Sequence, residues 1–207
     1  MQTLTEAIAA LHTKYRVPHI AITSVRLPWS TPSLFVIGST MTSTAKPRIF
    51  KIEVPAIDSF FSGTGDMFAA LMVVRLREAV SAIPGLAKTT AWISKDDVDA
   101  TELPLALAAE KALSSMQEVL TRTKKSRDAE LESYKQKAKA KGLELQDNKE
   151  LHLRVTKASE VRLVRNMEHL RNPQLKFHAE KVDFESIRAK ALEGGRTCPD
   201  YGRLAEE

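Results

Sequence analysis

The chain has 207 residues and a mass of 23.0 kDa, which is long enough for a domain to bury a core of its own. Hydrophobic residues make up 43% of the chain and charged residues 28%, a composition that argues against a disordered tail, a collagen-like fibre or a small disulfide scaffold. Its single cysteine, Cys198, permits no internal disulfide, and the longest clean apolar run is only Met67 to Val74. Because no signal peptide or membrane span is visible, the sequence predicts a cytoplasmic protein, with the nucleus as a second compartment and no membrane partner.

The formal net charge of +5 arises in one segment of the chain. Residues 121–165 carry 13 basic and 7 acidic side chains, whereas basic and acidic residues nearly balance elsewhere. Within this segment we expect a basic polar insertion at about 124–149, either as a solvated helical extension or as a mobile insertion. Lysines spaced by two spread around a helix and form no stripe, so no nucleic-acid partner is predicted; these lysines are Lys135, Lys137, Lys139 and Lys141.

The first part of the chain predicts one helix and three strands. Apolar residues at helical spacing from Leu4 to Tyr15 indicate a helix, which Pro18 ends. Short runs rich in Ile, Val and Phe then predict strands at 19–25, 34–39 and 48–54. The short connection between the second and third strands indicates a hairpin.

The second part of the chain predicts two helices, a loop and two short strands. The apolar segment from Met67 to about Ile83 predicts a buried helix, and helical periodicity returns from Leu105 to Thr123. Residues 84–104, with prolines at both ends and an acidic cluster, are predicted to form a loop. Alternating apolar residues predict short strands at 150–156 and 175–179.

Strands interleaved with helices argue for an α/β layer architecture. We expect residues 1–207 to form a single α/β domain that contains the polar insertion and ends in a tail at about 194–207. No internal repeat is visible.

The sequence Gly63-Thr64-Gly65-Asp66, at the start of a predicted helix, carries the most chemical content. Two glycines separated by one residue allow positive φ angles and a close approach of the backbone to a ligand. Their N–H groups and the helix dipole would form a site for a phosphate or a developing oxyanion. Asp66 could then accept a proton from a hydroxyl group, so the combination predicts a small-molecule kinase.

The same tetrapeptide has a simpler interpretation. The glycines would only form a tight turn, and Asp66 would only stabilise the start of the helix. The four residues taken alone favour this simpler interpretation over a catalytic one.

The surrounding sequence extends the pattern well beyond four residues. Phe61-Ser62-Gly63-Thr64-Gly65-Asp66-Met67-Phe68-Ala69-Ala70-Leu71 resembles the signature of the pyridoxal kinases, members of the ribokinase-like superfamily. Further matches follow in family order at Ile22-Thr23-Ser24, Leu34 to Ser39, Ala109 to Thr123 and Glu150 to Val155. The resemblance covers most of the chain and implies a partial ribokinase-like fold, with a central, mostly parallel sheet flanked by helices and incomplete on its N-terminal side.

The resemblance also implies roles for individual residues. Asp66 matches the base that activates the 5′-hydroxyl of pyridoxal, and Asp66 and Gly63 would contact that substrate. The anion hole would consist of Gly63, Thr64 and Gly65. The residues implied to bind ATP are Thr23, Ser24, Ile57, Thr64 and Gly65. Thr23 would in addition contact a monovalent cation, K⁺ or Na⁺.

The chain also departs from the family pattern. A complete pyridoxal kinase is expected to begin with a strand and a glycine-rich turn that contact the pyridoxal ring, followed by a segment that supplies ligands to Mg-ATP. Nothing in this sequence resembles either segment, so we expect a fragment, a truncated gene model or isoform, or a remnant without activity. No metal ligands are therefore assigned, and the missing strands would leave a sheet edge exposed.

Two functions of different classes follow from this comparison. The first is a pyridoxal kinase, in fragment or truncated form, which transfers the γ-phosphate of ATP to the 5′-hydroxyl of pyridoxal, pyridoxine or pyridoxamine with Mg²⁺ as cofactor. The second is a non-catalytic kinase-fold protein that acts by association with another subunit. The family commonly works as a homodimer, and whether this chain dimerises is left open.

Overall fold

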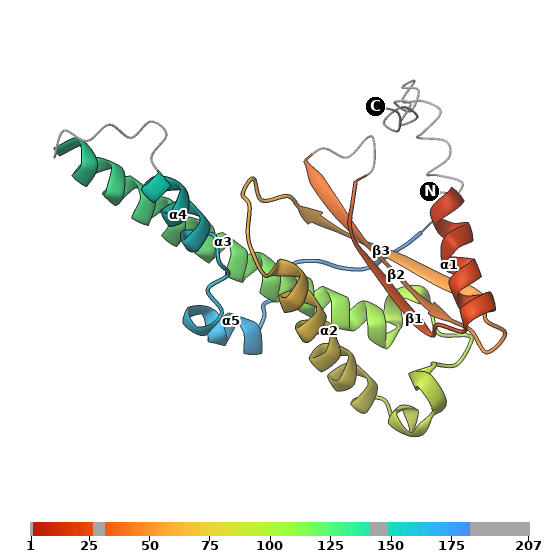
Figure 1. Cartoon of the computed structure of the whole chain (residues 1–207). Coiled ribbons are helices and arrows are strands. Elements are labelled where there is room, and N and C mark those ends of the chain that lie inside the picture. Colours follow the sequence, from red (N-terminus) through yellow and green to blue (C-terminus); the bar gives the residue numbers. More distant parts are fainter. Residues whose placement is uncertain (1, 27–31, 141–148, 183–207) are drawn as a thin grey trace, which may run out of the picture.

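The structure is a computed structural model that describes residues 2–26, 32–140 and 149–182 (Figure 1). The tail expected at about 194–207 lies outside the described residues. The helices are α1 Gln2–Tyr15, α2 Thr64–Ser81, α3 Pro104–Ala140, α4 Lys149–Ala158 and α5 Met167–Arg171. The strands are β1 His19–Val25, β2 Ser33–Met41, β3 Pro47–Pro55 and β4 Glu180–Lys181.

The strands form one sheet in the order β1-β2-β3-β4. The predicted hairpin is confirmed, since β2 pairs with β3 in continuous register from Ser33↔Pro55 to Met41↔Pro47. The expectation of a mostly parallel sheet is not confirmed, because all three strand pairings among the described residues are antiparallel. The short connection between β2 and β3 imposes this arrangement on that pair, whereas neighbouring parallel strands need a long crossover between them.

One face of the sheet packs against α1. Alternate residues of β2, Phe35 and Ile37, face this side together with Ile20 of β1 and Ile49 of β3. Ile8 of α1 completes this cluster at 1% exposure. The predicted helix over 4–15 is therefore confirmed as an amphipathic helix that covers one face of the sheet (Figure 1).

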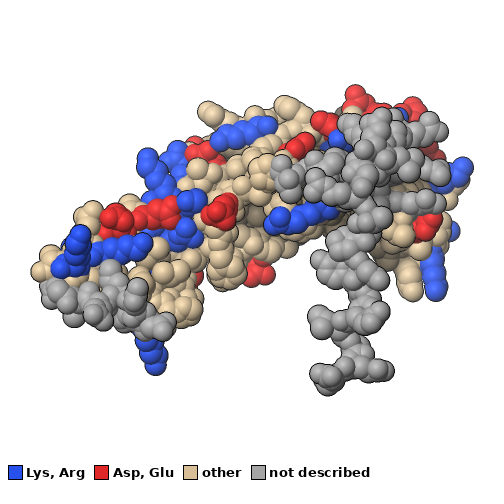
Figure 2. Space-filling model, turned by 90° about the horizontal axis from the view of Figure 1, so that it is seen from above, with Lys and Arg blue, Asp and Glu red and all other residues tan. Residues whose placement is uncertain are grey.

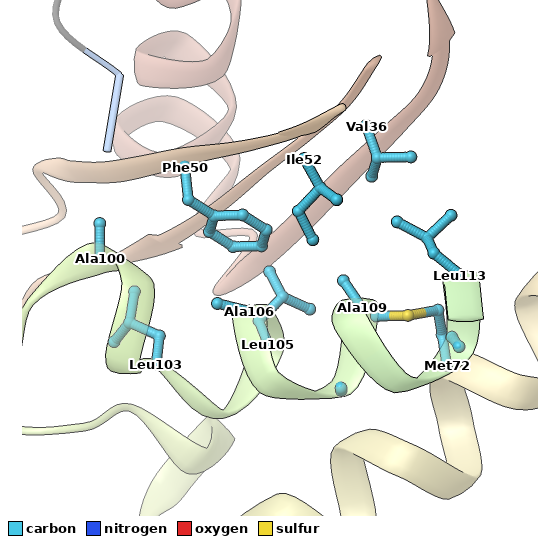
Figure 3. Packing of buried hydrophobic residues seen from close by; sticks show 12 residues of the cluster. Val36, Phe50, Ile52, Met72, Ala100, Leu103, Leu105, Ala106, Ala109 and Leu113 are labelled. Carbon is cyan, nitrogen blue, oxygen red and sulfur yellow. The ribbon is translucent and has the colours of Figure 1, made fainter. Parts of the chain in front are cut away.

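The opposite face of the sheet packs against α2 and α3 and forms the larger core (Figure 3). Phe50 and Ile52 of β3 are fully buried against small residues of α3, among them Ala106 and Ala109. Alanines at these positions let the helix approach the sheet closely, and Met72 of α2 fills the space beside them. Because the two faces of β2 are covered by different helices, its side chains are buried on both sides.

The predicted loop at 84–104 is largely irregular and contains three short 3₁₀ turns, at Leu86–Lys88, Thr90–Trp92 and Ala100–Glu102. Arg48 on β3 holds part of this loop to the sheet edge. Its guanidinium donates hydrogen bonds to the carbonyl oxygens of Lys95, at 2.6 Å, and Ser94, at 3.3 Å. The backbone of the loop is therefore anchored to the half-buried guanidinium of Arg48.

The basic segment after Thr123 continues as helix. For residues 124–140 the structure agrees with the solvated helical extension, since α3 runs without interruption to Ala140. Figure 1 shows this part of α3 projecting beyond the sheet with α4 beside it, and Figure 2 shows Lys and Arg side chains interspersed with Asp and Glu along it. Local ion pairs neutralise part of its charge, including Lys124 with Asp128 at 2.6 Å and Arg162 with Glu130 at 2.7 Å.

Two predicted strands in the last part of the chain differ in the structure. Residues 150–156 lie within the helix α4, so the predicted strand there is wrong. A short alternation of apolar residues fits the period of a strand as well as that of a helix. Leu151 and Val155 are also spaced as neighbours on one face of a helix. Residues 175–179 precede a strand of only two residues, β4, while Phe177 and Ala179 pack on the larger core.

No helix within residues 2–26, 32–140 and 149–182 is both long and apolar enough to cross a membrane.

Candidate functional site

The turn that begins α2 depends on Gly63. This residue has φ 88° and ψ 9°, a left-handed conformation in which a side chain would be strained. Its carbonyl oxygen accepts the hydrogen bond from the N–H of Met67 at 3.1 Å, which is the first turn of the helix. A glycine has no side chain to cap the helix, so the first-turn N–H groups of Thr64, Gly65 and Asp66 receive no side-chain cap from it.

Gly65 serves a different purpose from Gly63. The expectation of positive φ holds at Gly63 but not at Gly65, which lies inside the first turn of the helix. A Cβ atom built on either glycine would meet no atom within 4 Å, so the space in front of this turn is open. Unpaired N–H groups that face open space, at the positive end of a helix, are suited to bind an anion.

The end of β1 presents two consecutive polar residues on the same side. The register between β1 and β2 shifts between Ile22, which pairs with Ile37, and Val25, which pairs with Phe35. Two residues of β1, Thr23 and Ser24, thus occupy the space of one in β2, which is a β-bulge. Ser24 has a positive φ of 59°, and this local turn allows both residues to line the same cavity.

A cavity of about 570 Å³ lies between the end of β1, the start of α2 and the middle of α3. It brings together all five residues that the sequence implied for ATP binding, namely Thr23, Ser24, Ile57, Thr64 and Gly65. The remaining lining residues are Ala21, Leu34, Phe35, Val36, Val54, Pro55, Ser59, Phe60, Phe61, Phe68, Leu113, Met116, Gln117 and Leu120. The volume lies in the range of small-molecule and cofactor sites.

Gly63 and Asp66 adjoin this cavity but are not among its lining residues. Asp66 is exposed in the first turn of α2, one residue beyond Gly65. Within the part of the chain that the structure describes, its carboxylate makes no hydrogen bond or ion pair, in contrast to Asp96 and Asp99. Hydrogen bonds from Ser43, in the turn between β2 and β3, lower the pKa of Asp96, and hydrogen bonds from Thr101 lower the pKa of Asp99.

Sequence reasoning missed the wall of the cavity that α3 forms. Leu113, Met116, Gln117 and Leu120 recur at the spacing of one helix face, and this periodicity predicts a helix but does not indicate a cavity wall. Three of these four side chains are only half-buried. A polar residue inside an otherwise apolar stripe, Gln117, is the one signal in the sequence that distinguishes this wall from ordinary core.

The described residues bring together no group of three or more His, Cys, Asp or Glu side chains that could hold a metal ion. The lining of the cavity likewise contains no carboxylate among residues 2–26, 32–140 and 149–182. These residues do not form a Mg²⁺ centre by themselves, so no chemical step is assigned to a metal. A second cavity of about 580 Å³ lies between α3 and α4 and contains none of the predicted site residues.

No protein-family model matches the chain. A Schizosaccharomyces pombe protein with a provisional pyridoxal kinase name is 32% identical over 124 residues, which is 59% of this chain and 35% of that protein. The pyridoxal kinase of Arabidopsis thaliana is 28% identical over 179 residues, 85% of this chain and 42% of that enzyme.

Among solved structures, Plasmodium falciparum PdxK with the ligands AMP-PNP and PL aligns with a TM-score of 0.50 at 15% identity. The alignment covers 88% of this chain and 42% of that one, and it shows a shared fold. The described residues therefore share the fold of part of that longer α/β protein. By sequence the chain is related to pyridoxal kinases, and it spans well under half the length of the curated relatives it matches.

Proposed function

We propose that this chain carries the ATP-binding and phosphoryl-transfer part of a pyridoxal kinase. The reaction would transfer the γ-phosphate of ATP to the 5′-hydroxyl of pyridoxal, pyridoxine or pyridoxamine. One observation carries the proposal: the five residues implied for ATP binding, which come from β1, the loop before α2 and α2 itself, line a single cavity. The sequence relationship with pyridoxal kinases supports it independently.

The phosphates of the nucleotide would lie at the start of α2. The N–H groups of the first turn would donate hydrogen bonds to phosphate oxygens, and the positive end of the helix dipole would favour their negative charge. The left-handed conformation of Gly63 and the open space at Gly65 support this role, since both expose backbone N–H groups. The hydroxyl groups of Thr23 and Ser24 would add side-chain donors from the opposite wall.

Asp66 would act as the base. Its carboxylate would take the proton of the 5′-hydroxyl while that oxygen forms a bond to the γ-phosphorus. The bond between the γ-phosphorus and the oxygen of the β-phosphate breaks, and ADP leaves with that electron pair. Gly63, Thr64 and Gly65 would stabilise the charge that develops on the transferring group through their backbone N–H groups. The carboxylate of Asp66 is exposed next to the cavity and makes no hydrogen bond or ion pair with the described residues, which supports this assignment.

Five finer points belong to the same proposal. Mg²⁺ would neutralise charge on the phosphates, with ligands from outside the described residues. Thr23 would contact a K⁺ or Na⁺ ion near the phosphates, as the resemblance implies. Residues 1–207 would belong to one α/β domain that contains the basic polar insertion at about 124–149. A homodimer and a cytoplasmic location remain predictions from the resemblance and the composition.

Nucleotide binding by the purified chain tests the proposal directly. We expect AMP-PNP to bind in a calorimetric titration, and we expect Thr23→Val to weaken binding roughly 10-fold or more, since a hydrogen bond to a charged group is lost. The matched control is Thr13→Val on the exposed face of α1, where the hydroxyl only bonds the carbonyl of Ala9 at 2.8 Å. Absence of AMP-PNP binding, or equal binding by the Thr23 variant, would contradict the assignment.

Phosphoryl transfer is tested separately, with radiolabelled ATP and pyridoxal. Asp66→Asn is expected to abolish any transfer while AMP-PNP binding stays unchanged, because the amide cannot take the proton. Asp97→Asn, in the loop outside the cavity, is the control for loss of one carboxylate. A wild-type chain that binds nucleotide but transfers no phosphate would favour the alternative, a non-catalytic protein that acts by association.

A further inference from the structure

The polar groups in the cavity are few and of two kinds. Hydroxyl groups come from Thr23, Ser24, Ser59 and Thr64, and the only side-chain amide in the described lining belongs to Gln117. No charged side chain is among these lining residues. A ligand that extends from the start of α2 toward α3 would therefore find its most specific hydrogen-bonding partner at Gln117.

The side-chain amide of Gln117 is placed to contact a ligand in the cavity. It is half-buried on α3 between Leu113, Met116 and Leu120, which line the same cavity. Its backbone carbonyl accepts a hydrogen bond from the hydroxyl of Thr121 at 2.7 Å, but its side-chain amide has no partner among the described residues. An unpaired amide amid apolar side chains is available for a hydrogen bond from a bound molecule.

Ser59 supplies a second unpaired polar atom in the same cavity. Its side-chain oxygen is buried and has no hydrogen-bond partner in the described structure. The N–H of Ser59 donates to the carbonyl oxygen of Ile57 at 2.7 Å, so this tight turn holds Ser59 beside a residue that the resemblance implies for ATP binding. Buried polar groups normally have partners, and a bound ligand would provide one.

Apolar surfaces accompany these two polar groups. Val54 and Pro55 at the end of β3 and Ile57 in the loop that follows present carbon atoms to the cavity, together with Met116 and Leu120 of α3. A purine base has the same character, because it has flat apolar faces and a polar edge. The phosphate-binding features belong to the start of α2, which leaves the α3 wall for the base.

We propose that Gln117 reads the nucleobase and gives this site a preference for adenine over guanine; the inference rests on the proposed binding of ATP. A side-chain amide pairs with adenine through two bonds, in which its carbonyl accepts from the exocyclic amino group and its NH₂ donates to a ring nitrogen. A glutamate at this position only accepts, and guanine offers two adjacent donors on its Watson–Crick edge. The Gln117→Glu substitution should therefore move the preference from adenine to guanine.

The test compares AMP-PNP and GMP-PNP binding to the purified chain by calorimetry. The wild-type chain is expected to bind AMP-PNP more tightly, and Gln117→Glu to lower the ratio of AMP-PNP to GMP-PNP affinity by roughly 10-fold or more, the discrimination of one bidentate pair. Gln117→Met, similar in size but without hydrogen-bonding groups, should bring the two affinities together. The matched control is Gln136→Glu, the same substitution on the projecting part of α3, where the side chain bonds Glu132.

Tripolyphosphate, which carries no base, allows the proposed phosphate binding to be tested separately from the proposed role of Gln117. The affinity for tripolyphosphate reports on the phosphate site and, in the Gln117→Glu variant, on the repulsion by the added carboxylate. Gln117→Met should leave this affinity unchanged. A wild-type chain that binds tripolyphosphate and both nucleotides equally, or a nucleotide preference that neither Gln117 variant alters, overturns the role of Gln117 but not the proposed function. Failure of the wild-type chain to bind any of the three probes overturns both.

Discussion

The backbone N–H of Ser62 donates a hydrogen bond to the carbonyl oxygen of Ser159 at 3.1 Å. The carbonyl of Ser62 in turn accepts from the N–H of Val161 at 3.4 Å, so the two segments form a short parallel bridge. Ser62 immediately precedes Gly63, and Ser159 directly follows the end of α4. The position of the glycine turn therefore depends on a segment that lies almost a hundred residues later in the chain.

Replacement of Ser62 by proline is expected to loosen this connection. Proline has no N–H to donate to Ser159, so the free energy of unfolding should fall by about 1 kcal/mol, and AMP-PNP should bind more weakly. Urea unfolding and a nucleotide titration measure the two effects. Ser62→Ala keeps the N–H group and removes only an exposed hydroxyl, so it should behave like the wild-type chain. Equal stability of the proline and alanine variants would mean that the bridge does not hold the turn.

Gly38 on β2 leaves room for the ring of Phe50, the residue opposite it on β3. A Cβ atom at Gly38 would overlap the ring of Phe50, which is fully buried. Gly38→Ala is therefore expected to destabilise the fold by about 1–3 kcal/mol through overpacking, measured by urea unfolding. Phe50→Leu should reverse part of the loss in the double variant, although it is destabilising by itself. Simple additivity of the two substitutions would show that they do not compete for the same space.

Two histidines are expected to lower the free energy of unfolding in mild acid. His12 is fully buried, with its Nδ1 atom 2.6 Å from the carbonyl of Val17 and its Nε2 atom 2.7 Å from the hydroxyl of Ser39. Burial lowers the pKa of His12 and of His19 below the ordinary value of 6.5. As the pH falls below 6.5, the unfolded chain therefore binds protons before the folded chain does. The contribution of the two neutral histidines to the free energy of unfolding is complete above that pH and is lost below it.

Unfolding in urea at pH 7.5 and pH 5.5 measures this effect. We expect a lower midpoint at pH 5.5, and a smaller difference between the two pH values in the His12→Gln variant, because glutamine does not titrate. His152→Gln, on the exposed surface of α4, should retain the full pH dependence. A wild-type midpoint that is the same at both pH values would contradict the expectation.

Arg75 connects α2 with the end of α5. Its Nη2 atom donates to the carbonyl oxygens of Leu170, at 2.6 Å, and Arg171, at 2.8 Å, and its side chain is only 8% exposed. Arg75→Met should lower the free energy of unfolding by about 2 kcal/mol, because two carbonyl groups lose a charged donor. Arg75→Lys should recover only part of the loss, since it lacks the planar fork.

The control for this substitution is Arg122→Met, which removes an exposed pair with Glu118 on α3. A pair of this kind contributes about 0.3–0.5 kcal/mol, so the change in unfolding free energy should be small. Comparable losses for the two methionine variants would mean that Arg75 contributes no more than a surface ion pair.

The elements that local sequence predicts well are those with a continuous apolar pattern. The strands 19–25, 34–39 and 48–54 and the helix that begins near Met67 appear within a few residues of their predicted bounds. By contrast, 150–156 forms a helix because its short alternation fits both periods and because it packs beside the extension of α3. Packing between segments decides such cases, and the local pattern does not contain it.

The candidate site divides in the same way. The glycine turn and Asp66 are predicted from the chemistry of a local motif, whereas Thr23 and Ser24 are predicted only through the resemblance to a family. The α3 wall with Gln117 was missed, since a residue that lines a cavity has the same helical spacing as one in the core. The pairing that anchors Ser62 was missed because backbone hydrogen bonds between distant segments leave no trace in residue type.

The sequence by itself determined the composition class, the main helices and strands, and the motif at Gly63 to Asp66, because these depend on neighbouring residues. Only the tertiary structure decided that the described strand pairings are antiparallel, that a bulge turns Thr23 and Ser24 to the same side, and that α3 closes the cavity. Strand partners and cavity walls come from segments far apart in the chain. Their selection depends on the burial of apolar surface over the whole domain.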